Sequence, residues 1–393
     1  MNAEQHVPQF RFKDFSDSWV QRNLGDLAEI VRGASPRPIQ DPKWFDDSSE
    51  IGWLRISDVT EQNGRIHHLD QHISEAGQAK TRVLTEPHLL LSIAATVGKP
   101  LVNYVKTGVH DGFLIFMNPK FDLEFMFQWL ESYRDKWSRY GQPGSQVNLN
   151  SDLVKNQSIS IPSMDEQQKL GEFFTSIDNL IAANQRKLDL LKEQKKGYLQ
   201  KMFPKNGAKV PELRFAGFAD AWEDRKLSDI ADRFDNLRVP ITASDRKPGD
   251  TPYYGANGIQ DYVEGFTHNG EFILVAEDGA NDLKNYPIQY VNGKAWVNNH
   301  AHVLQGKKTI TDNKFLMNAI KNFNIEPFLV GGGRAKLNAD VMMKLNILLP
   351  TFVEQEKIGS LFSLLDKTIA LHQRKLDLLK EQKKGYLQKM FAK

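Results

Sequence analysis

The chain has 393 residues, 40% of them hydrophobic and 25% charged, which is typical of a globular protein with two to three domains. Its 51 Lys and Arg residues are nearly balanced by 49 Asp and Glu residues, so the net charge of +2 does not by itself favour a polyanionic partner. The lack of cysteine excludes disulfides, thiol nucleophiles and cysteine-ligated zinc. No stretch approaches about 18 uninterrupted apolar residues, and the N-terminus lacks a signal-peptide pattern, so we expect a cytoplasmic protein.

The first element along the chain is an entry segment that occurs twice. Residues 8–29 align with residues 211–232, and ten of the 22 positions are identical. The shared positions include an arginine, two phenylalanines and a tryptophan. Because several shared residues are large and apolar, we expect both copies to be buried.

A first variable region follows at residues 32–143. Short runs rich in β-branched and aromatic residues, broken by Gly, Asn and Pro, predict strands, and the apolar spacing over residues 123–137 predicts a helix. This mixture indicates a compact α/β or α+β globule. The predicted strands are residues 51–59, 88–98, 101–105 and 113–118.

A closing segment ends each globule. Residues 144–162 pair with residues 332–350, and each copy has the pattern of a Gly-rich loop, a short helical turn and a strand. The second variable region lies between the copies, at about residues 235–331, and its letters do not align with those of the first. It is predicted to contain strands at 253–263, 271–279 and 288–304 and a helix at 314–322.

The strongest repeat is a long helix after each closing segment. Residues 185–203 and 373–391 share the same nineteen letters, and the register continues upstream. A Ser/Thr-x-x-Glu capping box directly after a proline predicts each helix start. A helix of about 38 residues would be about 57 Å long, at 1.5 Å per residue.

Apolar residues recur in steps of three and four along both predicted helices, interrupted only by Asn184 and Lys195 in the first copy and by His372 and Lys383 in the second. So narrow a stripe predicts a coiled-coil seam rather than a helix lying on a globular core. The predicted seam residues are Leu170, Phe174, Ile177, Ile181, Leu188, Leu191, Tyr198, Met202, Ile358, Phe362, Leu365, Ile369, Leu376, Leu379, Tyr386 and Met390.

The exposed residues of the two helices also recur identically, which packing alone does not require. This repetition suggests one kind of partner bound twice, although a recent duplication would leave the same trace. The scaffold is thus duplicated almost unchanged, while the two globules differ. Such a pattern is expected for two different recognition modules on one rigid spacer.

The sequence contains no catalytic or cofactor-binding motif. Residues 96–100 come nearest to a phosphate-binding loop, but they lack its first glycine and its hydroxyl. Glu277 and Asp278 are expected to form a turn before Gly279 rather than an acid–base pair. Two histidine groups lack a third ligand at a known spacing, so we predict no metal site. These groups are His67, His68 and His72, and His300 with His302.

Candidate DNA-binding residues are loop residues of the types that contact bases or phosphates. Arg can bind guanine through two hydrogen bonds, Asn or Gln can pair with adenine, and Lys binds phosphates. Charged loop residues are usually only solvated, so we expect about a third of them to touch DNA. The candidates are Arg32, Arg37, Arg55, Lys99, Gln142, Ser145 and Gln146 in the first region, and Arg238, Lys247, Tyr253, Asn257, Lys284, Asn285, Arg334 and Lys336 in the second.

These features together resemble the specificity (S) subunits of type I restriction-modification systems. The resemblance is carried by two Pro-x-x-Arg-Phe-x-x-Phe-x-x-x-Trp entry segments, the Leu-Asn-x-Asp closing segments, the Glu-Gln-x-Lys helix starts and the repeated helix ends. It covers nearly the whole chain. The resemblance implies a mixed α/β protein in which two target-recognition domains are separated by two long helices, paired as an antiparallel coiled coil with pseudo-twofold symmetry. The implied domains are residues 1–160, 161–205, 206–348 and 349–393.

The same resemblance implies a function. Each recognition domain would read one half of an asymmetric, bipartite site in double-stranded DNA, and the helices would set the half-site spacing and dock two methyltransferase (M) subunits. Adenine-N6 methylation and ATP-dependent cleavage would belong to the M subunits and to restriction (R) subunits. The chain itself would then be non-catalytic, and S-adenosylmethionine, ATP and Mg would bind to its partners.

Two alternatives from other classes remain open. A coiled-coil adaptor whose globules bind proteins would show no sequence-dependent DNA binding even with partners present. A methyltransferase fused to its own recognition domain would carry a cofactor motif, and none is found. Crosslinking to S-adenosylmethionine would separate that second alternative from a specificity subunit.

Overall fold

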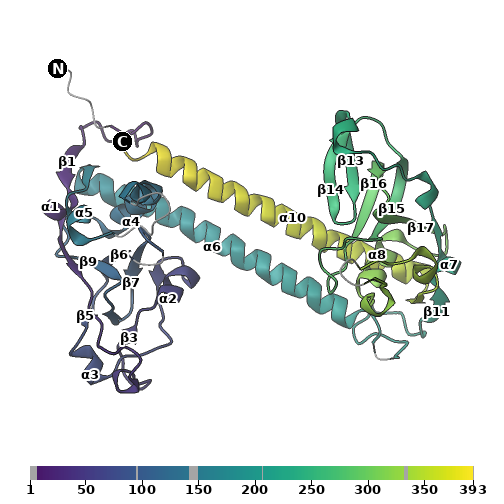
Figure 1. The fold of residues 1–393 in the computed structure, drawn as a ribbon, viewed down its shortest axis with the longest axis horizontal. Helices are drawn as coiled ribbons and strands as arrows, with labels where there is room; N and C mark the ends of the chain where they lie inside the picture. The colour runs from purple at the N-terminus through teal and green to yellow at the C-terminus, as the bar shows by residue number, and fades with distance from the viewer. Residues whose placement is uncertain (1–6, 94–95, 141–148, 206, 332–334, 393) are drawn as a thin grey trace. The chain divides into compact units, whose positions relative to one another are not determined.

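The computed structural model describes residues 7–93, 96–140, 149–205, 207–331 and 335–392 (Figure 1). The chain forms two compact units. Unit 1 comprises residues 1–184 and 375–393, and unit 2 comprises residues 185–374. Each unit is therefore a globule together with one half of each long helix, whereas the boundaries drawn from the sequence follow secondary structure alone. Among the described residues, no helix is both long enough and apolar enough to cross a membrane.

Unit 1 is built on a five-stranded sheet with the strand order β2-β9-β6-β7-β4. The side chains of β6 alternate between two cores: Leu89 and Leu91 pack with the helix α4, and Leu90 packs on the opposite face. Both faces are covered, so the strand is a continuous apolar run. The strands are β2 (Glu29–Arg32), β4 (Arg65–Ile66), β6 (Leu89–Ser92), β7 (Pro100–Asn103) and β9 (Phe113–Met117). The smaller sheets contain β3 (Gly52–Trp53), β5 (Arg82–Leu84) and β8 (Thr107–Val109), and β1 (Val20–Asn23) with β10 (Ser158–Ile161).

The predicted helix at 123–137 is present as α4 and the 3₁₀ turn after it, whereas the short helices α1, α2 and α3 were not predicted, and α2 replaces part of the strand expected at 51–59. The predicted strand ends after β3, and the chain enters the helix α2 instead. Asp58 accepts a hydrogen bond from the backbone amide of Arg55 at 2.7 Å, which caps the first turn of that helix and overrides the β-rich composition. The helices are α1 (Leu24–Leu27), α2 (Ile56–Glu61), α3 (Glu75–Gln78), α4 (Leu123–Tyr133) and α5 (Ser151–Lys155), with 3₁₀ turns η1 (Pro42–Trp44) and η2 (Arg134–Tyr140).

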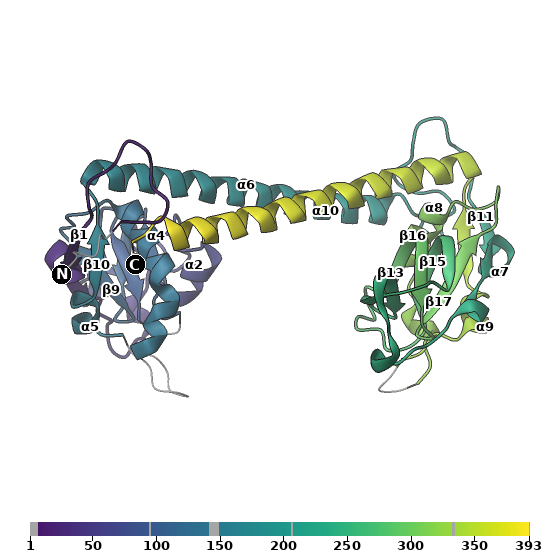
Figure 2. The same cartoon turned by 90° about the horizontal axis from the view of Figure 1, so that it is seen from above.

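Unit 2 is built on a six-stranded sheet with the order β12-β17-β15-β16-β13-β14, against which α8 packs (Figure 2). The predicted strand at 288–304 is two strands, β16 and β17, separated by a turn. The strands are β12 (Ala231–Arg233), β13 (Pro248–Gly255), β14 (Gly258–Val263), β15 (His268–Ala276), β16 (Ile288–Val297) and β17 (Ala301–Gly306), with β11 (Glu223–Lys226) paired to β18 (Asn346–Leu349). The helical segments are α7 (Leu227–Ile230), α8 (Asn313–Lys321) and α9 (Ala339–Met342), with 3₁₀ turns η3 (Asp235–Leu237), η4 (Ala243–Asp245) and η5 (Glu326–Phe328).

The two globules share part of their topology although their letters do not align. The order β2-β9-β6 in unit 1 is repeated as β12-β17-β15 in unit 2, with antiparallel pairing at every step. In unit 1, β2 and β6 end at the edge of the sheet where β9 begins. In unit 2, β12 and β15 end at the edge where β17 begins. This shared edge brings loops from distant parts of each variable region together.

The two long helices are confirmed as α6 (Met164–Lys201) and α10 (Phe352–Lys389), each of 38 residues. Their halves run antiparallel within each unit. In unit 1 Asp178 pairs with Lys383 at 2.6 Å, and in unit 2 Lys195 pairs with Asp366 at 2.5 Å. The two lysines that interrupt the apolar seam are therefore each neutralised by an aspartate of the facing helix.

Ten of the sixteen predicted seam residues contact the cores of the globules as well as the facing helix. The reason is that aromatic rings from the entry segments and from α4 and α8 meet the helix ends there. Phe174 stacks on Phe391 in unit 1 (ring centroids 5.7 Å), and Phe362 lies against Phe203 in unit 2 (6.0 Å). The ten residues are Leu170, Phe174, Ile177, Tyr386 and Met390 in unit 1, and Tyr198, Met202, Ile358, Phe362 and Leu365 in unit 2. The other six, Ile181, Leu188, Leu191, Ile369, Leu376 and Leu379, are buried or half-buried.

The entry segments are anchored to the helix starts through buried ion pairs. The serine half of the first predicted capping box is present, since the Glu166 amide donates to the Ser163 hydroxyl at 3.4 Å, but the glutamate half is replaced in both copies. Glu166 and Glu354 were expected to bind the backbone at their own helix starts. Each carboxylate instead accepts two hydrogen bonds from an arginine of an entry segment, Arg11 (both 2.7 Å) or Arg214 (2.7 and 2.8 Å). The expected burial of the entry segments is confirmed for their tryptophans, which are 3% and 1% exposed.

Candidate nucleic-acid interface

In unit 1 the structure brings two predicted DNA-binding arginines together at one sheet edge. We refer to the place where β2 and β6 end and β9 begins as the recognition edge of unit 1. Arg32, the last residue of β2, donates from Nε to the carbonyl oxygen of Asp111 at 2.6 Å. The guanidinium of Arg37 pairs with the Asp111 carboxylate at 2.6 Å while its side chain remains 72% exposed. Two exposed guanidinium groups are therefore presented side by side, in position to bind a polyanion.

Lys99 lies on the turn between β6 and β7, next to the same edge. Its ammonium group donates to Asn63 at 3.0 Å, and partial burial lowers the pKa of Lys99. Arg55 is not part of this edge. It lies at the start of α2 and pairs with Asp58 at 2.8 Å and with Asp70 at 3.6 Å, so two carboxylates already offset its charge.

In unit 2 the corresponding edge is where β12 and β15 end and β17 begins, and we call it the recognition edge of unit 2. The loop between β15 and β16 carries Lys284 and Asn285, which are both exposed. Asn257, from the turn between β13 and β14, donates to Gly279 O at 2.9 Å and accepts from Asn281 N at 2.9 Å. The side-chain NH₂ group and the side-chain oxygen of Asn257 are therefore both engaged in holding this loop. Reading adenine would require the same donor and the same acceptor.

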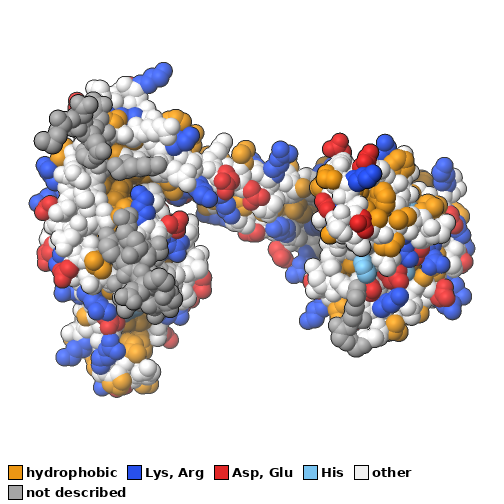
Figure 3. Space-filling model, turned by 45° about the horizontal axis from the view of Figure 1, so that its top comes forward, with side chains coloured by type: hydrophobic (Ala, Val, Ile, Leu, Met, Phe, Trp, Pro, Cys, Tyr) orange, Lys and Arg blue, Asp and Glu red, His pale blue; other side chains and the backbone are white. Residues whose placement is uncertain are grey.

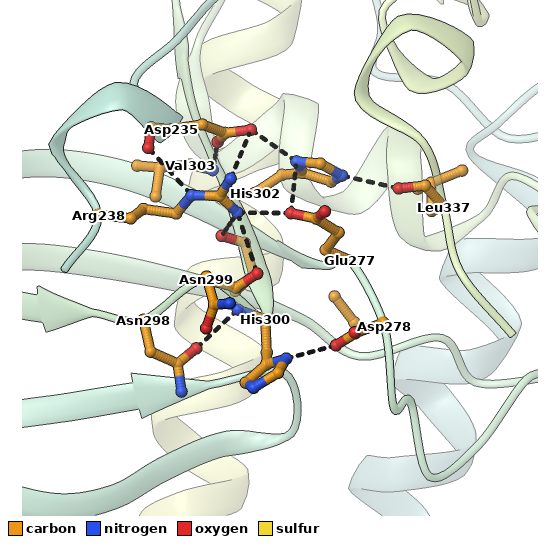
Figure 4. A network of polar contacts seen from close by, with 12 residues as sticks. Asp235, Arg238, Glu277, Asp278, Asn298, Asn299, His300, His302, Val303 and Leu337 are labelled. Atoms are coloured by element: carbon orange, nitrogen blue, oxygen red, sulfur yellow. Dashed lines mark hydrogen bonds and ion pairs between the residues drawn. The ribbon is translucent and has the colours of Figure 1, made fainter. Parts of the chain in front are cut away.

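A network of charged side chains ties the loops of the unit 2 edge together (Figure 4). Arg238 donates to Glu277 at 2.6 Å and to the carbonyl oxygen of Ala301 at 2.9 Å. Lys336 approaches the other oxygen of Glu277 at 2.9 Å, and the backbone amide of Leu337 donates to the carbonyl oxygen of Glu277 at 2.7 Å. Arg238 is thus mostly buried and fully engaged, while Lys336 is anchored at its tip and remains 45% exposed.

His302 is the buried member of this network, at 1% exposure. One ring nitrogen lies 2.7 Å from Asp235 and the other 2.8 Å from the carbonyl oxygen of Leu337. The ring therefore lies between a carboxylate and a backbone carbonyl oxygen, which tie it to η3 and to the segment after Lys336. The neighbouring pair of Asp278 and His300, 2.5 Å apart, adds a further tie at the same loop.

Asp235, Glu277 and His302 offer ligand atoms that all lie within 4.8 Å of one another, so a metal must be considered. The surroundings oppose it. Arg238 and Lys336 already bind Glu277, and a divalent cation there would face two positive charges at close range. Among the described residues, His67, His68 and His72 belong to no group of three close ligands.

The carboxylates of this network determine how the stability of unit 2 changes at acid pH. Burial opposes ionisation of Asp235 and Glu277, but hydrogen bonds from His302 and the Val303 amide, and from Arg238 and Lys336, lower the pKa of each carboxyl overall. Such carboxylates stabilise the fold above their unfolded pKa values, about 3.9 and 4.3, and lose that contribution as the pH falls through the lower folded values.

We therefore expect the stability of unit 2 to fall steeply below about pH 4 and the variant Asp235→Asn to flatten that dependence. Urea unfolding from pH 3 to 7 measures it, with Asp232→Asn, an exposed aspartate of the neighbouring strand β12, as the control. An unchanged slope in Asp235→Asn would show that the network does not couple protons to folding.

The remaining predicted residues are not gathered at an edge. Tyr253 is 1% exposed and its hydroxyl bonds to the backbone of Ile241, so it has a structural position in the sheet. Lys247 is exposed at the opposite end of the β13–β14 hairpin from Asn257. Four candidates, Gln142, Ser145, Gln146 and Arg334, lie outside the described residues.

Two carboxylates at the recognition edges were missed from the sequence. Asp111 and Glu277 carry the wrong charge for a DNA contact, and loop sequence gives no sign that a carboxylate orients arginines from elsewhere in the chain. Arg82 was missed as well: its Nε donates to the carbonyl oxygen of Arg32 at 2.7 Å. On the face drawn in Figure 3, basic and acidic side chains are interspersed in both units, as the balanced composition predicts.

Comparison with known proteins gives one consistent result. The sequence profile of the type I restriction modification DNA specificity domain matches residues 16–193 and 219–381, once in each half of the chain. A putative type I restriction enzyme specificity subunit of Haemophilus influenzae is 44% identical over 154 residues, which is 39% of the length of each protein. A putative specificity subunit of Methanocaldococcus jannaschii is 18% identical over 97% of this chain and 94% of its own length.

Solved structures support the fold. The type I restriction-modification S subunit of M. genitalium superimposes with a TM-score of 0.69 over 98% of this chain and 99% of its own, at 13% sequence identity. At that identity the likeness concerns the fold alone. Two recognition modules of one architecture, each closed by a repeated helix, define a duplicated DNA-specificity protein. The chain belongs to the type I restriction-modification DNA specificity family.

Proposed function

We propose that the two units read the two halves of an asymmetric, bipartite DNA site. The observation that carries the proposal is the pair of recognition edges. They occupy the same place in a shared strand order, yet one is built from Arg32, Arg37 and Asp111 and the other from Arg238, Glu277 and Lys336. The same platform with different side chains would bind two different base sequences.

The proposal extends to partners. The identical exterior residues of the two long helices favour two copies of one methyltransferase subunit, with restriction subunits added in the full complex. One solved structure with a similar fold (TM-score 0.50) concerns complex assembly and conformational transition of the type I R-M system. Methyl transfer to adenine and ATP-dependent cleavage, with their S-adenosylmethionine, ATP and Mg, would take place on those subunits. We place the assembled complex in the cytoplasm.

Modification-sensitive long-read sequencing of host DNA tests the proposal, with the gene intact, deleted and co-expressed with its neighbouring methyltransferase. Loss of adenine methylation at a single split motif on deletion, and its return on co-expression, is the expected result. A methyltransferase that needs this chain but modifies no split motif would contradict bipartite reading. Sequence-independent binding of the reconstituted complex would favour the protein adaptor instead.

The helices predict the spacing between the half-sites. Inserting one heptad into both α6 and α10 lengthens each by about 10.5 Å, at 1.5 Å per residue. Because DNA rises about 3.4 Å per base pair, we expect the unmodified spacer to widen by about three base pairs while both half-sites stay the same. The methylated motif of the variant measures this directly, and an unchanged spacer would rule out the helices as the ruler.

A further inference from the structure

We propose that Asp111 and Glu277 are positioning residues, each of which orients the cationic side chains of its own recognition edge and so governs the reading of one half-site without touching DNA. The inference rests on the proposed function, because it concerns how each edge reads DNA. It assigns a role to two acidic residues on surfaces that must approach a polyanion.

In unit 1, Asp111 binds three groups from the end of β2 and the segment that follows it. Its carboxylate binds the Arg37 guanidinium at 2.6 Å and the Ser35 hydroxyl at 2.8 Å, and its carbonyl oxygen accepts from Arg32 at 2.6 Å. Burial opposes ionisation, but Ser35 and Arg37 lower the pKa of Asp111 overall, so the residue stays charged. Arg37, although 72% exposed, therefore has a fixed direction.

In unit 2, Glu277 holds groups from two loops. Its side chain is 15% exposed and lies between Arg238 (2.6 Å) and Lys336 (2.9 Å). Its backbone accepts from Leu337, and Asp278 forms a backbone bridge to Lys336, so Lys336 and Leu337 are held beside the end of β15. Glu277 thus anchors an exposed lysine to the end of β15.

An acidic residue at a DNA-facing edge is unfavourable because its charge repels phosphates, unless it is paired with a cation that can itself reach the DNA. Both carboxylates meet this condition: each is paired with a cation whose outer part stays exposed. A lone Arg or Lys loses much rotational freedom when it binds DNA, and a carboxylate that orders the side chain beforehand removes part of that cost. Charge-assisted contacts of this kind also fix geometry.

The two residues are not copies of each other. Asp111 precedes β9, whereas Glu277 follows β15, so the carboxylates come from different strands of the shared order. Each edge therefore has its own independent anchor. This independence supplies an internal control, since a change at one anchor should leave the other half-site untouched.

The test uses the complex reconstituted with its methyltransferase and DNA carrying the methylated motif, with single-base substitutions in either half-site. We expect Asp111→Asn to reduce discrimination against substitutions in one half-site by about tenfold, and Glu277→Gln to do the same for the other half-site only. Matched controls are Glu50→Gln, whose partner Lys106 lies at the opposite end of β8 from Asp111, and Asp261→Asn, which pairs with Arg246. Both controls should behave as wild type.

A double-mutant cycle separates positioning from general destabilisation. If Asp111 acts through Arg37, then adding Asp111→Asn to Arg37→Ala should change discrimination less than twofold, and Glu277→Gln should likewise add little to Lys336→Ala. A loss of discrimination at both half-sites, or full additivity in the cycles, would overturn the inference. A wild-type complex that discriminates at neither half-site would instead reject the proposed function itself, so the two failures can be told apart.

Discussion

Replacing Arg214 by methionine should lower the free energy of unfolding of unit 2 by about 3–5 kcal/mol. The variant leaves the Glu354 carboxylate, whose side chain is 0% exposed, without the guanidinium that binds both of its oxygens. An uncompensated buried charge is one of the most destabilising changes that a single substitution can make. Hydrogen-exchange mass spectrometry under increasing urea follows peptides of unit 2 and unit 1 separately.

Two comparisons sharpen this prediction. Arg225→Met breaks an exposed pair with Glu223 at 2.6 Å and should lower the free energy of unfolding far less than Arg214→Met, because water screens an exposed pair. Arg11→Met in unit 1 should cost less than Arg214→Met, because the indole of Trp19 still donates to Glu166 at 3.2 Å. Among the described residues, the corresponding indole of Trp222 has no hydrogen-bond partner. Equal losses in Arg225→Met and Arg214→Met would show that burial does not control the effect.

Gly359→Ala should destabilise unit 2 by about 1–3 kcal/mol, although alanine normally favours a helix. A methyl group at this position of α10 would lie 2.4 Å from Asp312 Oδ1 and 2.9 Å from the backbone nitrogen of Phe315. Asp312 caps α8 by accepting from that same nitrogen at 2.7 Å, so neither atom can move without loss of the cap. The helix must instead move away from α8.

Gly197 provides the matched control, since it is also a helical glycine of unit 2 but has nothing within 4 Å of the added methyl group. Gly197→Ala should stabilise the protein by about 0.5–1 kcal/mol. Opposite signs for the two glycine substitutions in urea unfolding would establish close helix packing at Gly359. A stabilising Gly359→Ala would show that the helices can separate there at little cost.

The long helices, most strands and the duplicated scaffold could be predicted from sequence, because periodicity and repetition are local signals. The predicted strand at 51–59 failed where one side chain, that of Asp58, capped a helix. The sequence did not show that globular cores also cover the helix ends, because an apolar stripe looks the same whether a second helix or a globular core covers it.

The candidate site was predicted less well. Residue type and loop position selected Arg32 and Arg37, which the structure places at one edge, but they also selected Tyr253, which is buried, and Arg238, which holds loops together. Asp111 and Glu277 depend on partners 74 and 39 residues away in the chain. Contacts at such separations follow from the fold and leave no spacing that a single sequence can reveal.

The aromatic junction at each helix end affects how such proteins can diversify. Phe203 and Phe391 belong to identical nineteen-residue segments, yet each inserts into a different globule, beside Phe315 in unit 2 and beside Phe125 in unit 1. The two variable regions, whose sequences do not align, thus present the same kind of aromatic contact to identical helix-end segments. A different globule can attach to the long helices in the same way if it keeps an aromatic side chain that packs on this phenylalanine. The loops at a recognition edge lie on other elements than these contacts, so their residues can change without altering the attachment to the helices.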